Sequence, residues 1–580
     1  MTDLAPQDRA YYWSTLFFRE LCHNGVTHVV ISPGSRSTPL TLAAVSHPGL
    51  RTQVVLDERS AGFVALGIGK ATGTPAVLIS TSGTAVANYY PAVIEARLSG
   101  VPLILATADR PPNLRNTGAN QAIDQLKIFG NYPVFFHEAG EPAFDKTDLL
   151  RLEMLAQQAV EASVLQKGPV HLNFPFRKPL EPRPSFVSET ERENRSLLKQ
   201  TDARTHTYSL SVNRPSISVP PVIRELIEQS ERPLIVSGPL SGVPAAHSIQ
   251  ELAEIIDAPV LSEGGFASPY AIHGFEGFLR DETNRQKLEP DLILRFGFQP
   301  VGKAVERALR AWSPVPHIHF ASSEAWHDAT FSTTHRVSWQ ERPVDWNLER
   351  HAHSGWLARW KSAEECYIKK AESILAGEPA LTDLHAYHYL TPQIPENWSV
   401  FLSNSFPVRD SQLAGRYRTP FVYLNRGASG IDGITSTAMG ISIARSRPSV
   451  LFTGDLAFLH DTNALLSNHL LRQPLIVVIL NNQGGNIFRM LPVAEHASYY
   501  RDFFETPQSA ELSAMSGTYG VSYSLAANVE ALANLDLIEM AETAGEGIYL
   551  IECRTNSEAS MKLRHALWSG DGNGGREPEE

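Results

Sequence analysis

The sequence predicts an α/β protein with three doubly wound parallel-sheet domains. Short apolar stretches alternate with helical stretches through three parts of the chain, and runs rich in Gly, Ser or Asn follow several of them. Strands that alternate with helices form a parallel sheet covered on both faces, and its ligands bind at the carboxyl ends of the strands. We expect domains at 1–182, 222–380 and 381–568, a polar, proline-rich linker at 183–221 and a disordered Gly-rich tail at 569–580.

Composition narrows the class of protein. The 580 residues are 43% hydrophobic and 19% charged, and a net charge of −12 leaves no broad basic field for nucleic acid or an anionic membrane. Cys22, Cys366 and Cys553 lie far apart, which argues against a disulfide framework or a zinc site and favours a reducing compartment. The first residues show no signal-peptide pattern, and no apolar run has the length of a membrane span. We therefore expect a cytoplasmic protein without membrane insertion.

Each domain is predicted from its own strands and helices. In the first domain the strands are expected at 26–31, 76–80 and 102–106, with a helix at 62–71. In the second they are expected at 233–238, 258–261 and 291–297, and a helix at 356–376 leads to the third domain. Strands at 399–402, 450–453 and 475–480 define that third domain.

The most informative pairing is Gly454-Asp455 followed by Asn481-Asn482. Each pair ends an apolar strand, and a helical segment separates the two strands. Parallel strand ends share one crevice, so Asp455 and Asn482 should present a carboxylate and an amide oxygen together beside Gly484-Gly485. Such hard oxygen ligands suit Mg²⁺ or Ca²⁺ shared with a phosphate. A Gly-Asp turn alone is common in loops; the order and spacing of the whole segment favour the site.

This segment resembles the diphosphate-binding motif of thiamine diphosphate (ThDP) enzymes. The resemblance implies that Asp455, Asn482 and the Gly484 carbonyl bind Mg²⁺, with Mn²⁺ as a possible substitute. It also implies that Gly454, Leu456 and Gly485 line the diphosphate site. Leu456 stands where the family often has Gly.

A second motif, Asp57 to Phe63, follows an apolar stretch at 53–56 and precedes an apolar helix. A carboxylate at a helix start is favoured by the helix dipole, so Glu58 could be only an N-terminal acid. The ThDP resemblance instead implies that Glu58 lies beside N1′ of the cofactor and promotes its activation. In that family this Glu and the diphosphate site usually belong to different subunits, which implies a homodimer or a homotetramer.

Further runs are similar to one family of ThDP enzymes, the synthases that make 2-succinyl-5-enolpyruvyl-6-hydroxy-3-cyclohexene-1-carboxylate on the route to menaquinone and phylloquinone. The runs are those at 32–40, 57–63, 80–85, 107–111, 118–123, 403–410, 425–433 and 481–492, together with the middle segment at 295–303. The family decarboxylates 2-oxoglutarate and adds the succinyl carbanion carried by ThDP to isochorismate in a 1,4-addition. We expect the same transferase activity here; the sequence leaves open which quinone is the final product.

Four arginines in these runs suit the two substrates. Arg36, Arg110, Arg409 and Arg426 fall in or beside Gly, Ser or Pro turns. Arg binds a carboxylate through two parallel hydrogen bonds, and 2-oxoglutarate and isochorismate each carry two carboxylates. A single Arg is usually only a solvated surface charge, but joint placement in cofactor-facing loops favours a binding role.

The resemblance implies a role for each matching residue. Glu58, Arg36 and Arg409 are expected to act in catalysis. The residues expected at the substrates are Ser35, Arg36, Arg110, Asn120, Gln121, Lys303, Ser405, Arg409, Arg426, Ile487 and Phe488. Those expected at the cofactor, besides the diphosphate and metal residues, are Glu58, Ser82, Gly83, Gly430, Ile431, Ile487 and Phe488. Ile431 and Phe488 could instead be packing residues, and Ala304 stands where the family can have a second basic residue.

Three alternatives remain open at this stage. An acetohydroxyacid synthase or a simple 2-oxo acid decarboxylase would act on less charged acids and would not need so many loop arginines. A dinucleotide-binding protein should carry a Gly-x-Gly-x-x-Gly run that opens its first helix, and this chain does not. A non-catalytic regulator would not need Glu58, Asp455 and Asn482 intact.

Overall fold

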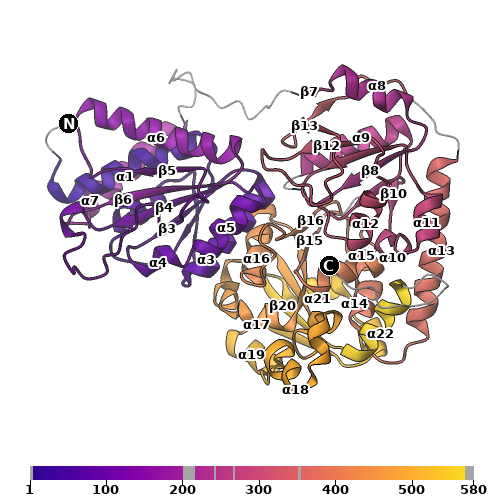
Figure 1. The fold of residues 1–580 in the computed structure, drawn as a ribbon. Helices are drawn as coiled ribbons and strands as arrows, with labels where there is room; N and C mark the ends of the chain where they lie inside the picture. The colour runs from indigo at the N-terminus through magenta and orange to yellow at the C-terminus, as the bar shows by residue number, and fades with distance from the viewer. Residues whose placement is uncertain (1–3, 200–215, 241–242, 265–267, 351–354, 569–580) are drawn as a thin grey trace. The chain divides into compact units, whose positions relative to one another are not determined.

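A computed structural model describes residues 4–199, 216–240, 243–264, 268–350 and 355–568; the predicted tail lies outside them. Within this described part the strands form three six-stranded parallel sheets and one two-stranded pair (Figure 1). The α/β class and the parallel sheets are therefore as predicted. The chain divides into two compact units: Met1–Asn213 with Thr435–Arg445 and Asn463–Leu470 form one, and the remaining residues form the other.

The first sheet has the strand order β2-β1-β3-β4-β6-β5. Its strands are β1 (His28–Ile31), β2 (Arg51–Val54), β3 (Ala76–Ser80), β4 (Leu103–Asp109), β5 (Phe135–Glu138) and β6 (Pro169–Pro175). Its helices are α1 (Pro6–His23), α2 (Thr38–Val45), α3 (Glu58–Thr72), α4 (Thr84–Ala87), α5 (Tyr90–Leu98) and α6 (Lys146–Leu165), with a 3₁₀ turn η1 (Pro112–Leu114). Alternate strand residues face opposite sides: Val77 packs with α1, α2 and α6, whereas Leu78 packs with α3 and α5. Both faces are therefore covered.

Part of the predicted linker is a helix. Residues Pro184–Lys199 form α7 in the first unit. Phe186 of α7 contacts Tyr11 of α1, with ring centroids 6.1 Å apart, and Nε of Arg183 donates to Oδ2 of Asp8 at 2.7 Å. The linker interpretation failed here because the high charge of this segment concealed the few apolar residues that pack on α1. Residues 200–215 of the predicted linker lie outside the described residues.

The middle sheet has the order β10-β9-β8-β11-β12-β13, the order of dinucleotide-binding sheets. Its strands are β8 (Pro233–Ser237), β9 (Val260–Ser262), β10 (Ala271–Ile272), β11 (Leu292–Phe296), β12 (His317–Ala321) and β13 (His335–Ser338). β7 (Ile217–Ser218) pairs with β14 (Val344–Asp345). The helices are α8 (Pro221–Gln229), α9 (Val243–Ile256), α10 (Phe275–Phe278), α11 (Glu282–Lys287), α12 (Lys303–Ala311) and α13 (Trp356–Ala376), the last with the predicted bounds.

The third sheet has the order β16-β15-β17-β18-β20-β19. Its strands are β15 (Ser399–Leu402), β16 (Val422–Leu424), β17 (Ser449–Gly454), β18 (Pro474–Asn481), β19 (Ser522–Ala526) and β20 (Gly547–Arg554). Its helices include α14 (Asp383–Leu390), α15 (Phe406–Ala414), α16 (Ile434–Arg445), α17 (Asp455–His460), α18 (Ala497–Tyr500), α19 (Leu512–Tyr519), α20 (Val529–Ala533), α21 (Leu537–Ala544) and α22 (Ser557–Trp568). The same part of the chain also contains the 3₁₀ helices η2 (Thr391–Gln393), η3 (Thr462–Leu470), η4 (Asn486–Met490) and η5 (Pro492–Glu495) and the π-helix η6 (Arg501–Glu505).

The first and third sheets share one topology. When the strands of each sheet are numbered in chain order, both sheets have the spatial order 2-1-3-4-6-5. The second strand lies at one edge and the fifth at the other. In both, the chain leaves in opposite directions from a central pair, β1 and β3 in the first sheet and β15 and β17 in the third. The carboxyl ends at such a switch point form the crevice where ligands bind in open α/β sheets.

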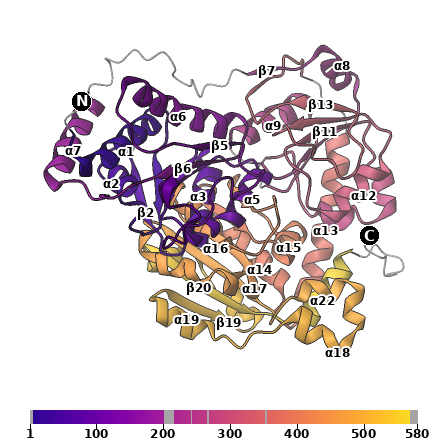
Figure 2. The same ribbon diagram turned by 60° about the vertical axis from the view of Figure 1, so that its left-hand side comes forward.

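Helix α16 follows strand β16 of the third sheet in the chain, but residues Thr435–Arg445 of this helix belong to the first compact unit. A Cβ added to Gly67 of α3 would lie 2.1 Å from the carbonyl oxygen of Thr437, so a glycine is required where the two helices meet. Both helices are labelled in Figure 2. Among the described residues, no helix combines the length and the apolar character that a membrane span needs.

Candidate active site

Glu58 is the first residue of α3, two positions before its first fully buried residue. Asp57 caps the helix, because its Oδ1 accepts the backbone N–H of Arg59 at 2.8 Å. Asp57 therefore provides the capping contact, and the half-buried carboxyl group of Glu58 is left for another role. The strand before the helix ends at Val54, two residues before the end of the apolar stretch at 53–56.

Four of the predicted substrate and cofactor residues meet at the carboxyl ends of β3 and β4. Arg110 donates from Nη1 to Oγ of Ser82 at 2.9 Å and from Nε to the carbonyl oxygen of Asn120 at 3.1 Å. Gln121 donates from Nε2 to the carbonyl oxygen of Ser82 at 3.0 Å, and Ser82 donates from its hydroxyl to the carbonyl oxygen of Gln121 at 3.0 Å. These bonds fix the direction of the Arg110 guanidinium group at the strand ends.

Arg36 lies in the loop between β1 and α2, and its side chain is buried. Nη1 donates to the carbonyl oxygen of Phe176 at 2.8 Å, while the buried Nε has no hydrogen-bond partner among the described residues. Burial lowers the pKa of the Arg36 guanidinium, and the neighbouring Arg110 adds to the effect, which Asp109 partly opposes. A buried cation with an unused donor is a ready site for a carboxylate. Ser35, in the same loop, is exposed.

The acid between these arginines is Asp109, the last residue of β4. It is fully buried and accepts hydrogen bonds from Nδ2 of Asn173 at 2.9 Å and from Arg115 at 3.0 Å. Arg115 also pairs with Glu138. In this cluster Arg36, Arg110 and Arg115 outnumber the carboxylates of Asp109 and Glu138, which suits an anionic ligand.

Gly83 follows Ser82 in a conformation that favours glycine. Its φ is 93°, and a Cβ there would lie 3.0 Å from Cγ of Gln121. Its backbone N–H donates to Oε1 of Gln125 at 2.9 Å. A glycine is therefore required to bring the backbone at the end of β3 against the Gln121 loop.

In the third sheet, Asp455 directly follows β17 and begins α17. Its carboxylate is buried and accepts the backbone N–H of Leu456 at 2.9 Å and of Gly484 at 2.8 Å. Burial raises the pKa of Asp455 to about 7, although these two backbone donors oppose the shift. A cation beside the carboxylate would favour its charged form.

Asn482 and Gly484 lie at the end of the neighbouring strand β18. Nδ2 of Asn486 donates to Oδ1 of Asn482 at 2.8 Å and approaches the carbonyl oxygen of Gly484 at 3.4 Å. The predicted pairing of Asp455 with Asn482 at adjacent strand ends is consistent with this geometry, because β17 and β18 are parallel neighbours and Asp455 binds the loop that Asn482 begins.

The donor set fits a hard cation. Asp455, Asn482 and Gly484 offer a carboxylate, an amide oxygen and a backbone carbonyl, which are ligands that Mg²⁺ accepts together with phosphate oxygens. Among the described residues no cluster of three or more His, Cys, Asp or Glu side chains could hold a metal alone. An ion here would depend on oxygen atoms from its ligand, as Mg²⁺ does when it binds a diphosphate.

The glycines around Asp455 differ in their surroundings. A Cβ on Gly484 would lie 2.1 Å from the carbonyl oxygen of Glu505, and one on Gly485 would lie 2.6 Å from that of Phe504. Both are therefore required by the close approach of η6. A Cβ on Gly454 would meet no atom within 4 Å, so the backbone at the end of β17 borders open space.

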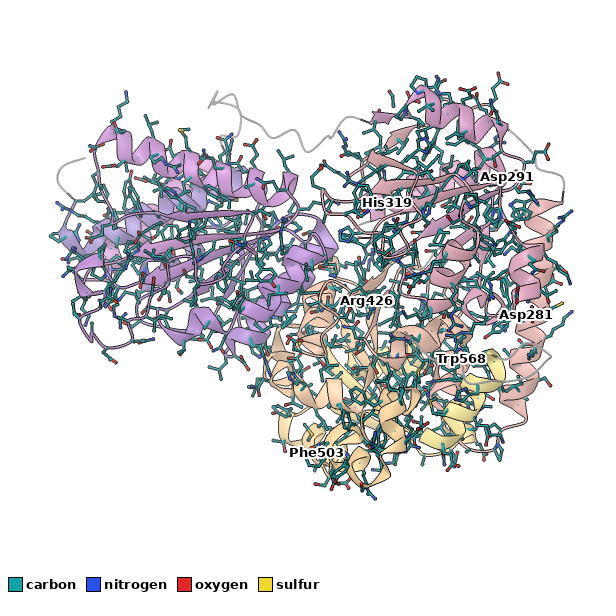
Figure 3. All side chains as sticks on the ribbon, viewed as in Figure 1. Asp281, Asp291, His319, Arg426, Phe503 and Trp568 are labelled. Carbon is teal, nitrogen blue, oxygen red and sulfur yellow. The ribbon has the colours of Figure 1, made fainter. Side chains whose placement is uncertain are left out.

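Ser405, Arg409 and Arg426 gather at the carboxyl ends of β15 and β16. Arg409 donates from Nη1 to the carbonyl oxygen of Ser405 at 2.7 Å, and Ser405 has a φ of 72°. Nη1 of Arg426 donates to Oδ1 of Asn404 at 2.9 Å, and Asn404 donates to the carbonyl oxygen of Gly430 at 2.6 Å. Figure 3 labels Arg426, which follows strand β16. Asn404 thus ties the Arg426 loop to the Gly430 loop.

The predicted apolar residues are partly accessible. Ile431 is 38% exposed, which argues against the alternative that it is a core residue and leaves it free to contact a ligand. Ile487 and Phe488 are half-buried in η4, and the Phe488 ring contacts Phe504 edge to face at 5.9 Å. Phe488 therefore packs on η6 and still has accessible surface.

Lys303 begins α12, the helix between strands β11 and β12 of the middle sheet. Its Nζ pairs with Oε2 of Glu306 on the same helix at 3.1 Å. The turn before it is held by the buried Glu263, which accepts the backbone N–H of Val301 at 2.6 Å and of Gly302 at 2.8 Å. Lys303 thus stands on a fixed turn, with an ion pair that a stronger anion could replace.

Several residues that organise the site could not be identified from the sequence. They are Asp109, Arg115, Glu263, Asn404 and Asn486, whose contacts are given above, and Asp383, which accepts a hydrogen bond from Nδ2 of Asn482 at 3.1 Å. Asp109, Asn404 and Asn486 lie inside the motif runs 107–111, 403–410 and 481–492, and this placement was the available signal. Asp383 follows Thr382 before an apolar helix, a pattern that indicates a helix N-terminus and nothing more.

Comparison with known proteins agrees with this geometry. Residues 13–128 match the family model for the N-terminal TPP binding domain of thiamine pyrophosphate enzymes, and residues 411–572 match the model for the C-terminal TPP binding domain. Thiamine pyrophosphate is another name for ThDP. The two matches contain the first sheet's Glu58 and the third sheet's Asp455 respectively.

Curated relatives extend the likeness over the whole chain. The 2-succinyl-5-enolpyruvyl-6-hydroxy-3-cyclohexene-1-carboxylate synthase of Bacillus velezensis is 35% identical over 567 residues, covering 95% of this chain and 96% of that protein. The synthases of the same name from Geobacillus kaustophilus and Chlorobaculum tepidum are each 36% identical and cover 95% and 96% of this chain. The chain belongs to the family of ThDP-dependent 2-succinyl-5-enolpyruvyl-6-hydroxy-3-cyclohexene-1-carboxylate synthases.

Proposed function

We propose that this protein decarboxylates 2-oxoglutarate and adds the remaining succinyl unit to isochorismate, forming 2-succinyl-5-enolpyruvyl-6-hydroxy-3-cyclohexene-1-carboxylate. The observation that carries the proposal is the pair of arginine clusters, one at each of two sheets with the same strand order. Arg36 and Arg110 stand at the first, and Arg409 and Arg426 at the third. 2-Oxoglutarate and isochorismate together carry four carboxylates, and each of these four arginines can bind one carboxylate.

The cofactor would bind to residues of the first and third domains. Asp455, Asn482 and the Gly484 carbonyl would hold Mg²⁺, or Mn²⁺ in its place, against the diphosphate. The backbone at Gly454, Leu456 and Gly485 would line the diphosphate, and that at Ser82, Gly83 and Gly430 the rest of the cofactor. The accessible side chain of Ile431 suits an apolar contact with the thiazolium ring. Bound ThDP would supply the electron sink for the loss of CO₂ and the carbon nucleophile for the new carbon–carbon bond.

Glu58 would hold a proton at N1′ of the cofactor. Its carboxyl group is free for this role because Asp57 makes the capping bond of α3. Ile487 and Phe488 would form an apolar wall that excludes water where CO₂ leaves. The chain itself would therefore contribute one positioned acid, Glu58, and an apolar surface that excludes water. The arginines would orient the substrates.

The two arginine clusters would take different substrates. Arg409 and Arg426, with Ser405, belong to the domain that would hold the diphosphate, so we assign them to the succinyl carboxylate of 2-oxoglutarate. Arg36 and Arg110, with Ser35, Asn120 and Gln121, would bind the carboxylates of isochorismate. Lys303 would exchange its Glu306 partner for a substrate carboxylate.

The assembly is part of the proposal. Glu58 and Asp455 would come from different subunits of a homodimer or homotetramer, so that the active sites would lie at subunit interfaces. The enzyme would act in the cytoplasm, in menaquinone or phylloquinone synthesis. Sedimentation that shows a dimer or a larger assembly would support this arrangement, and an active monomer would contradict it.

Product identification tests the function. The purified protein would be incubated with ThDP, Mg²⁺, 2-oxoglutarate and isochorismate, and the products separated and identified by mass spectrometry. The proposal predicts the named cyclohexene carboxylate and sustained CO₂ release only when both substrates are present, whereas 2-oxoglutarate alone should release no more than one CO₂ per active site. Pyruvate in place of 2-oxoglutarate is the control, because an acetohydroxyacid synthase or a simple decarboxylase would use it readily.

A further inference from the structure

A buried carboxylate with no assigned role contacts the Asn482 amide. Asp383, the first residue of α14, is fully buried, and its Oδ2 accepts a hydrogen bond from Nδ2 of Asn482 at 3.1 Å. An ionised carboxylate can only accept hydrogen bonds, so it selects the NH₂ end of the amide. The other end, Oδ1, must then face away from Asp383.

A second contact favours the same orientation. Oδ1 of Asn482 accepts from Nδ2 of Asn486 at 2.8 Å. Nε of Arg489 donates to Oδ1 of Asn486 at 2.7 Å, which fixes the direction of that second amide as well. Since Arg can only donate, the chain from Arg489 through Asn486 ends on the oxygen of Asn482. An amide oxygen has two lone pairs, so Oδ1 keeps one for a cation.

Asp383 is itself held by a buried ion-pair cluster. Nη2 of Arg564, on α22, lies 2.5 Å from Oδ2 of Asp383, and the same guanidinium binds Asp410 through Nε at 2.8 Å and Nη2 at 2.5 Å. Thr555 donates from its hydroxyl to Oδ1 of Asp383 at 2.5 Å. The guanidinium also lies 3.6 Å from the centroid of the Phe406 ring. Every oxygen of Asp383 therefore has a fixed donor, so the carboxylate cannot turn away from Asn482.

We propose that Asp383 is a positioning residue that fixes the Asn482 amide so that its oxygen is presented to the divalent cation of the diphosphate site. The inference rests on the metal site assigned above. Groups that orient a metal ligand in this way commonly contribute about 10–100-fold to metal affinity. The Arg564 cluster contains two comparable acids. Asp383 and Asp410 are both buried and both pair with Arg564. Among the contacts of the described residues, only Asp383 of these two accepts a hydrogen bond from Asn482.

This likeness provides a matched control. Mn²⁺ binding would be measured by electron paramagnetic resonance with ThDP present and without substrates, in the wild type, Asp383→Asn and Asp410→Asn. Each variant removes one negative charge from the Arg564 cluster. Asp383→Asn should weaken Mn²⁺ binding about 10–100-fold, because an asparagine can face Asn482 with either end. Asp410→Asn should lie within about threefold of the wild type. Equal losses in both variants would show a merely structural or long-range charge effect and overturn the proposal.

A double-mutant cycle with Asn482→Ala separates this inference from the metal site itself. If Asp383 acts through Asn482, adding Asp383→Asn to Asn482→Ala should cause little further loss. Additive losses would overturn the proposal and leave the metal site standing. If the wild type binds no Mn²⁺ with ThDP, or Asn482→Ala binds it unchanged, the metal site fails and the inference with it. If circular dichroism shows Asp383→Asn to be unfolded, Thr555→Val decides: a severalfold loss of affinity supports the role, and unchanged affinity contradicts it.

Discussion

Arg110 reaches from the end of β4 to the end of the adjacent strand β3, where its Nη1 donates to Oγ of Ser82 at 2.9 Å. A second bond, from Nε to the carbonyl oxygen of Asn120 at 3.1 Å, fixes the guanidinium plane. Burial lowers the pKa of the Arg36 guanidinium, and the nearby charge of Arg110 lowers it further. Two like charges held together by a fixed framework are a cost to the fold that an anionic substrate would relieve.

The two arginine clusters should separate the half-reactions. A lost charge-assisted hydrogen bond costs about 1.5–3 kcal/mol, or about one to two decades in binding. Arg110→Ala should therefore weaken the use of isochorismate and spare single-turnover decarboxylation of 2-oxoglutarate without isochorismate. Arg409→Ala should slow that decarboxylation. Rapid-quench measurement of CO₂ release checks both variants, and the inverse pattern would mean that the carboxylate assignments are exchanged.

Replacement of Glu58 should remove activation and spare the fold. In Glu58→Gln the amide cannot share a proton with the cofactor, so turnover should fall by about 100- to 10,000-fold. Proton–deuterium exchange at C2 of the bound thiazolium ring, followed by NMR, measures the affected step. The variant of the adjacent residue, Asp57→Asn, is the control, because Asn can also cap a helix. Exchange at C2 in this variant should be as fast as in the wild type. Fast exchange in Glu58→Gln would remove Glu58 from the activating role.

Loss of the buried carboxylate at β17 should prevent cofactor binding. Asp455→Ala removes the one charged ligand proposed for Mg²⁺, so ThDP binding should fall below detection in a calorimeter. Asp536→Ala, which removes the side-chain cap of α21 in the same domain, should cost about 1 kcal/mol of stability and bind ThDP normally. Unchanged ThDP affinity in Asp455→Ala would contradict the metal assignment.

Glu263 should make stability depend on pH. Burial raises its pKa to about 7, despite the bonds from Val301 and Gly302. Because the folded protein holds the Glu263 proton more tightly than the unfolded chain does, this proton contributes its full stabilisation below pH 4.5, the ordinary pKa of Glu. The contribution is lost as the pH rises through 7. The stability of the wild type relative to Glu263→Gln should therefore fall by about 3 kcal/mol from pH 4.5 to 7.5. Denaturant midpoints across this range measure it.

Local features of the fold were predictable from the sequence. The bounds of β3, β15 and α13 match the predictions, because each is a strongly periodic or continuously apolar segment. Strand order was not predictable in this way, since it depends on pairings between distant segments. Helix α7 was missed because α1, more than 150 residues earlier, supplies the surface that its Phe186 covers.

The residues of the candidate site were also predictable only in part. Motifs that follow strands located Asp455, Asn482, Arg110 and Arg426, because strand ends converge in any parallel sheet. Their supporting partners were not found: Asp383 meets Asn482 and Arg564 only after folding brings together segments about 100 and 180 residues apart. The roles assigned to the site residues remain predictions.

The central claim is the decarboxylative transfer of a succinyl unit, and isotope tracing tests it most directly. 2-Oxoglutarate labelled with ¹³C at C1 would be supplied together with isochorismate, ThDP and Mg²⁺, and the products analysed by mass spectrometry. The account predicts that all the label leaves as CO₂ and that the cyclohexene carboxylate is unlabelled, whereas uniformly labelled 2-oxoglutarate gives a product heavier by its four succinyl carbons. Labelled carboxylate retained in the product, or release of labelled CO₂ without any product from isochorismate, would contradict it.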